Sequence, residues 1–239
     1  GAVHPLDLPD GRVFGTVWSV NDNGQSVGSV YKARQFGQVD AAMWNGSQPT
    51  ILGTLGGSSA VAVGVNANGW TVGWAYDAKE LPRGYLKRLG NPMVDVQEEA
   101  GIPAAQRTTM KLVKVNDAGV AVGCSAYSRA GEGCGHSVVY DGVTRTLTTL
   151  PDLGFGGGAT NVSTDSQTVT GMVVDAGHTA RAALWRNGAL QTIPVLGGDS
   201  EAMNIGASGT VVGHLGTLTG FGAWMYRDNK VTMLDSLVP

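Results

Sequence analysis

Ring-bearing side chains recur just after a Val-Gly pair that appears several times in the chain. Two tyrosines lie three residues after such a pair, a third lies four residues after one, and a tryptophan and a histidine directly follow the glycine. A flat ring beside polar side chains suits sugar or peptide recognition, because the ring stacks and the polar rim hydrogen-bonds. Packing between strands is the alternative role. The binding candidates are Tyr31, Trp74, Tyr76, Tyr127, His178 and His214.

The two cysteines, Cys124 and Cys134, bracket one predicted loop. Cys124 directly follows a repeat glycine and Cys134 precedes the next strand, so a hairpin would bring them together. We expect a disulfide that adds about 2–3 kcal/mol by closing this loop. Two buried thiols, or half of a metal site, are the alternatives.

Catalytic, metal and cofactor signatures are weak. Asp77 and Glu80 share one loop, and a glycosidase needs two carboxylates about 5–10 Å apart. The one Gly-x-Ser-x-Gly string, at residues 24–28, lies inside a predicted hairpin and not at the strand-to-helix turn of a hydrolase elbow, and the glycine-rich corners lack the Lys-Ser/Thr of a phosphate loop. The Asn-Asp-Asn-Gly at residues 21–24 lacks most calcium ligands and is explained as a turn. We therefore assign no catalytic residue, no metal and no cofactor, and leave enzymatic activity open.

One phrase organises the whole chain: Asn, two residues, Gly, two residues, Val-Gly. The phrase is clear three times, loses both Asn and the first Gly in a fourth copy, and keeps its glycines but has Gly in place of Asn in a fifth. Its final positions are 28, 73, 123, 170 and 213. Asn at the start of a turn and Gly at a positive φ predict a hairpin centre, so each copy predicts strand–turn–strand.

A second motif follows each phrase and predicts two further strands. It consists of small residues, apolar residues and an aromatic one, then a turn and a short strand. Its recurrent aromatics are expected in the core; they are Trp44, Tyr140, Trp185 and Tyr226. Four antiparallel strands per unit of about 45 residues predict an all-β, five-bladed β-propeller. A β-solenoid is the alternative.

We expect one domain over residues 1–239. Residues 6–11 resemble a spare fourth strand that would pair with the last unit and close the ring. Residues 97–100 are the one predicted helical turn.

Composition limits the classes of partner. The formal net charge of −3 and the absence of a basic stripe argue against nucleic-acid binding. No apolar stretch reaches the roughly 18 residues of a membrane span. The first residues carry no export signal, so we expect any export peptide to be already removed.

The repeat resembles a known family. The phrase Leu-Gly-Thr-Leu-Gly-Gly-Ser-Ser-Ala at residues 52–60, the Asn-x-x-Gly-x-x-Val-Gly turn and the aromatic-ended strand together resemble the HAF-type extracellular repeat. Its His-Ala-Phe element corresponds to His136-Ser137-Val138. The resemblance implies a bacterial, exported β-propeller, extracellular or periplasmic. The family has no agreed activity and supplies no catalytic residue.

Three functions remain open. A binding module for a surface glycan or partner protein is the leading hypothesis. A structural or adhesive repeat domain without a small ligand is the alternative, and a carbohydrate-active enzyme that uses loop carboxylates is the second alternative. We place the binding face at the loops between the second and third strands of each unit, because loops on a rigid scaffold carry function.

Overall fold

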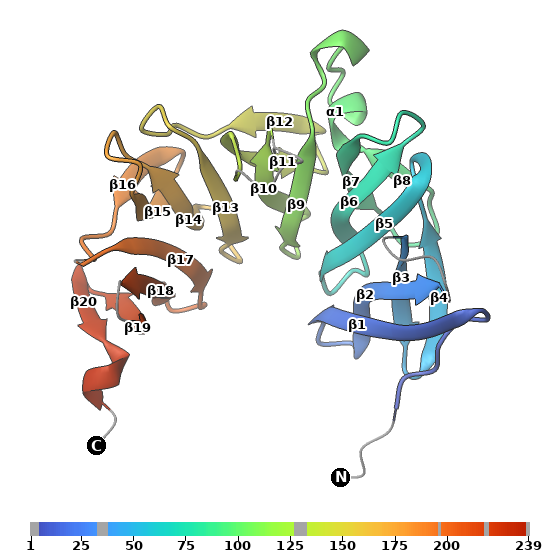
Figure 1. The fold of residues 1–239 in the computed structure, drawn as a ribbon, viewed down its shortest axis with the longest axis horizontal. Coiled ribbons are helices and arrows are strands. Elements are labelled where there is room, and N and C mark those ends of the chain that lie inside the picture. Colours follow the sequence, from blue (N-terminus) through green and yellow to red (C-terminus); the bar gives the residue numbers. More distant parts are fainter. Residues whose placement is uncertain (1–4, 33–37, 127–132, 196, 218–219, 238–239) are drawn as a thin grey trace. The chain divides into compact units, whose positions relative to one another are not determined.

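The computed structural model describes residues 5–32, 38–126, 133–195, 197–217 and 220–237. Five four-stranded antiparallel sheets follow one another along the chain, each made of four consecutive strands (Figure 1). The all-β prediction with four strands per repeat is therefore confirmed. The described chain divides into two compact units, one formed by Gly1–Ala121 and Asp141–Thr146 and the other by Val122–Tyr140 and Leu147–Pro239.

The strand bounds follow the predicted repeats. The first sheet contains β1 (Arg12–Val20), β2 (Gln25–Lys32), β3 (Val39–Asn45) and β4 (Gln48–Gly53). The second contains β5 (Gly56–Val65), β6 (Thr71–Asp77), β7 (Pro82–Lys87) and β8 (Met93–Asp95). The third contains β9 (Met110–Val115), β10 (Val120–Ser125), β11 (His136–Asp141) and β12 (Thr146–Thr149). The fourth contains β13 (Gly157–Val162), β14 (Thr168–Val174), β15 (Ala180–Arg186) and β16 (Ala189–Thr192). The fifth contains β17 (Asp199–Ile205), β18 (Val211–Thr217), β19 (Gly220–Arg227) and β20 (Lys230–Met233), followed by the 3-10 turn η2 (Leu234–Leu237).

The asparagine of the repeat phrase closes the first hairpin and reaches the next sheet. Asn66 Oδ1 accepts the N–H groups of Asn68 and Trp70 at 3.0 and 2.9 Å. Its Nδ2 donates to the carbonyl of Asn116 at 2.9 Å, and Asn21 Nδ2 donates to Asn66 O at 2.7 Å. The phrase is thus both a turn and a link between successive sheets of the first unit.

The last glycine of the phrase is required by a close backbone approach. A Cβ on Gly28 would lie 1.9 Å from Thr16 O, and one on Gly73 would lie 1.9 Å from Val61 O. Both glycines face a bulge in the preceding strand, where the two backbones come close together. No side chain fits there.

The fourth repeat departs from the predicted spacing by one residue. The sequence pattern places Thr170 at the final position, but Gly171 occupies it: Gly171 pairs with Ala159 beside the bulge, and its Cβ would lie 2.1 Å from Gly158 O. The reason is a longer turn, since Ser163 N bonds to Thr168 O where Asn21 N bonds to Gln25 O. The required glycine is therefore present.

In each unit, one sheet buries a face against the first strand of the sheet that follows it. In the first unit, Val27, Ala41 and Met43 form one cluster with Ala62 and Val65 of β5. In the second, Leu184 and Ile193 pack in one cluster with Ala202 of β17. The four recurrent aromatics predicted for the core, Trp44, Tyr140, Trp185 and Tyr226, are all at most 3% exposed, which confirms that prediction.

Residues 6–11 do not form the expected closing strand. The segment is not a strand, and the fifth sheet consists of β17 to β20 within the described residues. Asp7 N instead donates to Ser47 O at 3.0 Å, and Trp44 Nε1 donates to Asp7 O at 2.8 Å. The segment is held by the third-to-fourth-strand turn of the first sheet and the tryptophan that precedes it.

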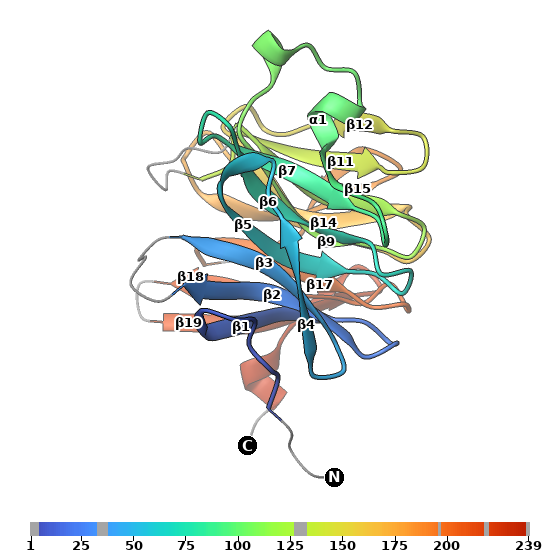
Figure 2. The ribbon, with the colours of Figure 1, turned by 90° about the vertical axis from the view of Figure 1, so that its right-hand side faces the viewer.

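A short insertion between the second and third sheets interrupts the repeat. It carries α1 (Val96–Glu99) and the 3-10 turn η1 (Ala104–Gln106), and it contains the predicted helical turn. Figure 2 shows α1 beside β7, against which it packs. Within the described ranges, no helix has the length and apolar character needed to span a membrane.

Candidate functional site

Two of the loops between second and third strands, β6–β7 and β14–β15, are each organised by an aspartate–arginine pair. Asp77 Oδ1 accepts the N–H groups of Lys79 and Leu81 at 2.8 and 3.0 Å, and its Oδ2 accepts Arg83 Nε at 2.8 Å. The β14–β15 loop repeats this arrangement. Asp175 accepts the N–H groups of Gly177 and Thr179 at 2.9 and 3.1 Å and Arg181 Nε at 2.7 Å.

These contacts explain the acidity of both aspartates. Burial raises the pKa of Asp77, but the N–H groups of Leu81 and Lys79 together with the Arg83 guanidinium outweigh it, so the pKa lies below its usual value. The pKa of Asp175 is lowered by Arg181 and then by the Thr179 N–H. Both side chains are carboxylates at neutral pH and hold their loops closed.

A cavity of about 560 Å³ opens beside the β6–β7 loop of the second sheet. The loop, the corner before β5, strand β8 and the insertion each contribute to its wall. Its charged lining consists of Asp77, Lys79, Arg83, Asp95, Glu98, Glu99 and Arg107, and its apolar lining includes Leu55, Met93 and Val94. The volume lies in the range typical of small-molecule sites. We call this cavity the loop pocket.

Several charged side chains that line the loop pocket are buried and paired. The side chains of Arg83 and Asp95 are 8% and 9% exposed. Arg83 also donates to Thr108 O at 2.9 Å, and Arg107 pairs with Glu98 at 2.8 Å. Burial raises the pKa of Asp95, and the opposing effects of the Gln97 N–H and of Arg107 and Arg83 are smaller. The pocket therefore offers fixed donors and acceptors beside an apolar wall.

The sequence pattern placed Asp77 and Glu80 in this loop but did not predict the pocket. Residues from 55 to 107 meet only after folding. The one available signal was the insertion itself, because it breaks the repeat period at residues 97–110.

The predicted ring platforms are already in contact with neighbours. Tyr31 stacks on Phe14 with ring centroids 4.2 Å apart and an interplanar angle of 12°. Lys111 Nζ lies 4.6 Å from the centre of the Trp74 ring. Tyr76 is half-buried on the same strand as Trp74. Tyr31 lies within β2, and Trp74 and Tyr76 within β6, so the two tyrosines belong to the ends of these strands and not to the loops in which the sequence pattern placed them.

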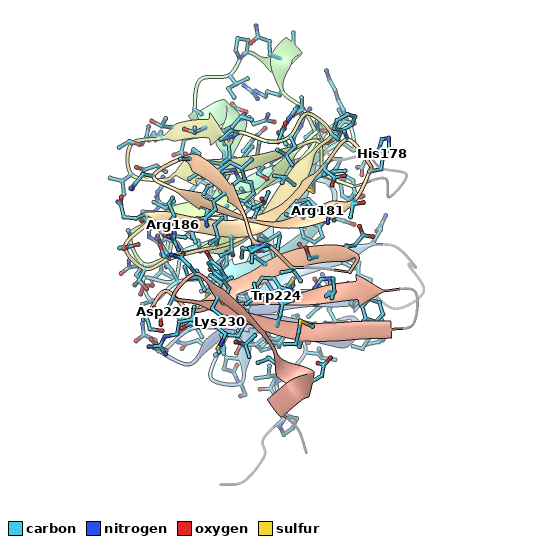
Figure 3. The ribbon with its side chains drawn as sticks, turned by 90° about the vertical axis from the view of Figure 1, so that its left-hand side faces the viewer. His178, Arg181, Arg186, Trp224, Asp228 and Lys230 are labelled. Atoms are coloured by element: carbon cyan, nitrogen blue, oxygen red, sulfur yellow. A yellow bond between two sulfur atoms is a disulfide. The ribbon has the colours of Figure 1, made fainter. Side chains whose placement is uncertain are left out.

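The predicted histidines lie in the second unit. His178 is exposed in the β14–β15 loop, edge-on to Phe155 at 5.5 Å. His214 meets Phe221 at 6.5 Å, and its backbone carbonyl accepts Trp224 Nε1. Figure 3 shows His178 and Arg181 toward one end of the fourth sheet and Arg186 toward the other. The remaining candidate, Tyr127, lies outside the described residues.

The carboxylates considered for catalysis have structural partners. Asp77 holds Arg83, and Glu80 accepts Ser58 N at 2.9 Å and Ser58 Oγ at 2.7 Å. These contacts fasten the β6–β7 loop to β5. The geometry gives both side chains a role in shaping the loop.

The third sheet carries the predicted disulfide between Cys124 and Cys134, whose Cα atoms lie 5.6 Å apart. Gly135 N, next to Cys134, donates to Ser125 O at 3.0 Å. The bond joins β10 to the chain just before β11. In the described parts of the chain, no group of three or more His, Cys, Asp or Glu side chains is placed to hold a metal ion.

Comparison with solved structures identifies the class of fold. The chain is similar to TolB from Acinetobacter baumannii, with TM-score 0.59 and 13% identity over 88% of this chain and 52% of that one. It is similar to a putative TolB from Agrobacterium tumefaciens, with TM-score 0.61 and 11% identity over 93% and 80% of the two chains. It also matches the β-propeller domain of the Trilobed protease from Pyrococcus furiosus, with TM-score 0.58 and 9% identity over 95% and 72%.

These likenesses show a fold of the β-propeller class. The chain spans about half the length of the Acinetobacter TolB chain. No protein-family model and no curated protein matches the sequence. Membership of the HAF-type repeat family therefore stays a prediction from the repeat phrase.

Proposed function

We propose that residues 1–239 form one HAF-type, five-bladed propeller domain that acts outside the cytoplasm as a binding module for a surface glycan. The loop pocket carries this proposal, because it combines a ligand-sized volume with fixed polar groups and an apolar wall. Export is supported by the Cys124–Cys134 disulfide, since such bonds persist in oxidising compartments.

The charge arrangement favours a hydroxyl-rich ligand at the loop pocket. Arg83 is paired with Asp77, and Arg107 with Glu98, so the pocket presents opposite charges side by side. Hydroxyl groups both donate and accept, and therefore satisfy such paired groups without leaving a charge unmatched. The apolar wall of Leu55, Met93 and Val94 suits the C–H face of a sugar ring.

Two matched variants test the loop pocket. Ala78 lines the pocket directly after Asp77, and Ala176 follows Asp175 at the same place in the β14–β15 loop. We expect Ala78→Trp to abolish the chemical-shift change that a glycan found on an array causes at Arg83 Nε in the loop pocket, and Ala176→Trp to leave that change intact. A change at Arg83 that survives Ala78→Trp in a folded protein would exclude this pocket.

A double substitution tests the predicted ring platforms. If Tyr31 and Tyr76 stack against the ligand, Tyr31→Ala with Tyr76→Ala abolishes binding and leaves the melting temperature nearly unchanged. Each stacking contact contributes about 0.5–1.5 kcal/mol. An unfolded double variant would show that the rings belong to the core, and normal binding would place the site elsewhere.

A partner protein is the second candidate ligand. Strand β1 exposes large apolar side chains, including Phe14 at 54% and Trp18 at 58%. Exposed apolar clusters mark interaction surfaces in soluble proteins. A peptide array screened beside the glycan array separates the two candidates.

A further inference from the structure

Two further cavities occupy the same place in the repeat. One, of about 380 Å³, lies between the first and second sheets of the first unit. The other, of about 300 Å³, lies between the third-sheet residues and the fourth sheet of the second unit. Each lies at the end of its own sheets that carries the first-to-second and third-to-fourth strand turns, away from the second-to-third strand loops. We call them the turn pockets.

The linings of the turn pockets correspond by position. Met43 and Val139 each precede the core aromatic of the third strand, and Leu52 and Leu150 are the buried leucines near the end of the fourth. Thr50 and Thr148 lie two residues before those leucines.

The following sheet contributes corresponding residues as well. Gly69 and Ser166 hold the same turn position, with φ of 72° and 62°. Thr71 and Val169 lie two residues before the close-approach glycines Gly73 and Gly171. Two units of one chain thus build the same cavity from different side chains.

Each turn pocket has polar groups available to a ligand. The hydroxyls of Thr50 and Thr148 and the amides of Asn45 and Asn187 make no side-chain hydrogen bond to any part of the chain that the structure describes. Each hydroxyl and each amide can both donate and accept. Beneath them lie Met43 and Leu52 in one pocket, and Val139 and Leu150 in the other.

A charged ligand does not fit both turn pockets. The turn pocket of the second unit is lined by no Lys, Arg, Asp or Glu within the described residues. A phosphate or carboxylate would lose hydration there without gaining a countercharge. A sugar hydroxyl is satisfied by the threonine and amide groups, and its C–H face by the apolar floor.

We propose that the turn pockets are two equivalent binding sites for a neutral saccharide, so that one chain binds a repetitive glycan at more than one point. The proposal does not depend on the loop pocket. Two weak sites on one chain raise the apparent affinity for a polymer well above that for a single sugar, because the second contact is intramolecular.

The test follows the side-chain amide signals of Asn45 and Asn187 by nuclear magnetic resonance. The probes are the methyl glycosides of glucose, galactose and mannose, each titrated into the full chain. We expect both amide signals to shift with at least one common glycoside, with dissociation constants within tenfold of each other. If neither amide shifts with any of the three, the proposal is wrong.

Filling variants assign each signal to its pocket. Thr50→Phe should abolish the shift at Asn45 and leave that at Asn187, and Thr148→Phe should do the reverse. Ile51→Phe and Thr149→Phe are the controls, because these neighbours on the same strands do not line the pockets. Shifts that persist in both filled variants overturn the proposal.

Ala78→Trp separates this proposal from the proposed function. The variant fills the loop pocket and should leave both amide shifts intact. Loss of both shifts in a folded Ala78→Trp protein would show that the sugar acts through the loop pocket and would overturn the two-site proposal.

Discussion

At the residue scale, the repeated asparagine contributes more than a turn. Asn66 is 3% exposed and uses both ends of its amide: Oδ1 closes its own hairpin and Nδ2 bonds to the next sheet's turn. A buried group of this kind is costly to remove, because its partners are left without hydrogen bonds.

We expect Asn66→Ala to lower the free energy of unfolding by about 2–3 kcal/mol in a denaturant titration. Asn68→Ala is the control in the same turn, since its side chain is exposed and makes one bond to Asp117 O at 3.0 Å. The control Asn68→Ala should lower the free energy of unfolding by less than about 1 kcal/mol. Equal losses for the two variants would contradict the role given to Asn66.

The loop aspartate gives a pH dependence with a defined sign. The folded-state pKa of Asp77 is lowered, so its ion pair with Arg83 contributes stability above the unfolded pKa, which is about 3.9. That contribution is lost as the pH falls through the folded pKa. Asp77→Asn keeps an oxygen for the turn but removes the charge.

We expect Asp77→Asn to lower the melting temperature by about 2–4 °C at pH 7, which corresponds to about 1 kcal/mol. The gap between variant and wild type should close as the pH is lowered below about 4. A gap that stays constant from pH 7 to pH 3 would show that the charge contributes nothing.

At the element scale, the strands were predictable because each turn depends on a few residues that are adjacent in the sequence. Asn and Gly define the hairpin, and small residues followed by an aromatic define the third strand. The alignment of the fourth repeat was wrong by one residue, because an extra residue in its turn moves the glycine to Gly171. Gly171 is required because its backbone lies close to Gly158 O, and this closeness arises only when the two strands pair.

The candidate site was less predictable than the strands. The loop pocket joins an aspartate of one loop to an arginine of the insertion, and the turn pockets join two successive sheets. No local pattern records which residues of neighbouring sheets face each other. The equivalence of the two turn pockets becomes visible only when the strand pairing of each sheet is known.

The disulfide is the covalent element that a single experiment can remove. Cys124 and Cys134 are separated by 10 positions, so the bond removes about 2–3 kcal/mol of chain entropy from the unfolded state. We expect the Cys124→Ala, Cys134→Ala variant to lose that much stability and to keep the fold. Thiol titration of the denatured, unreduced wild-type chain should find no free thiol; two thiols per chain would contradict the bond.

At the scale of the whole molecule, one position of the repeat is exposed in the first sheet and buried in most of its counterparts. The residue that precedes the turn phrase is buried in the second, third and fourth repeats: Val65 is 4% exposed, Val115 2% and Val162 5%. Its counterpart in the first sheet, Val20, is 64% exposed. The same position of the repeat is therefore buried in three sheets, half-buried at Ile205 in the fifth, and exposed in the first.

Glutamate substitutions at this position of the repeat test whether the face of β1 that carries Val20 is exposed to solvent. We expect Val65→Glu to prevent folding or to cost more than about 3 kcal/mol, because it buries an unpaired carboxylate. Val20→Glu should lower the free energy of unfolding by less than about 0.5 kcal/mol, as substitutions at exposed positions do. Val143→Glu is the matched control, at a valine 67% exposed outside any strand. If Val20→Glu destabilises the protein as Val65→Glu does, another surface covers the first sheet in solution, and the exposed face of β1 is an interface.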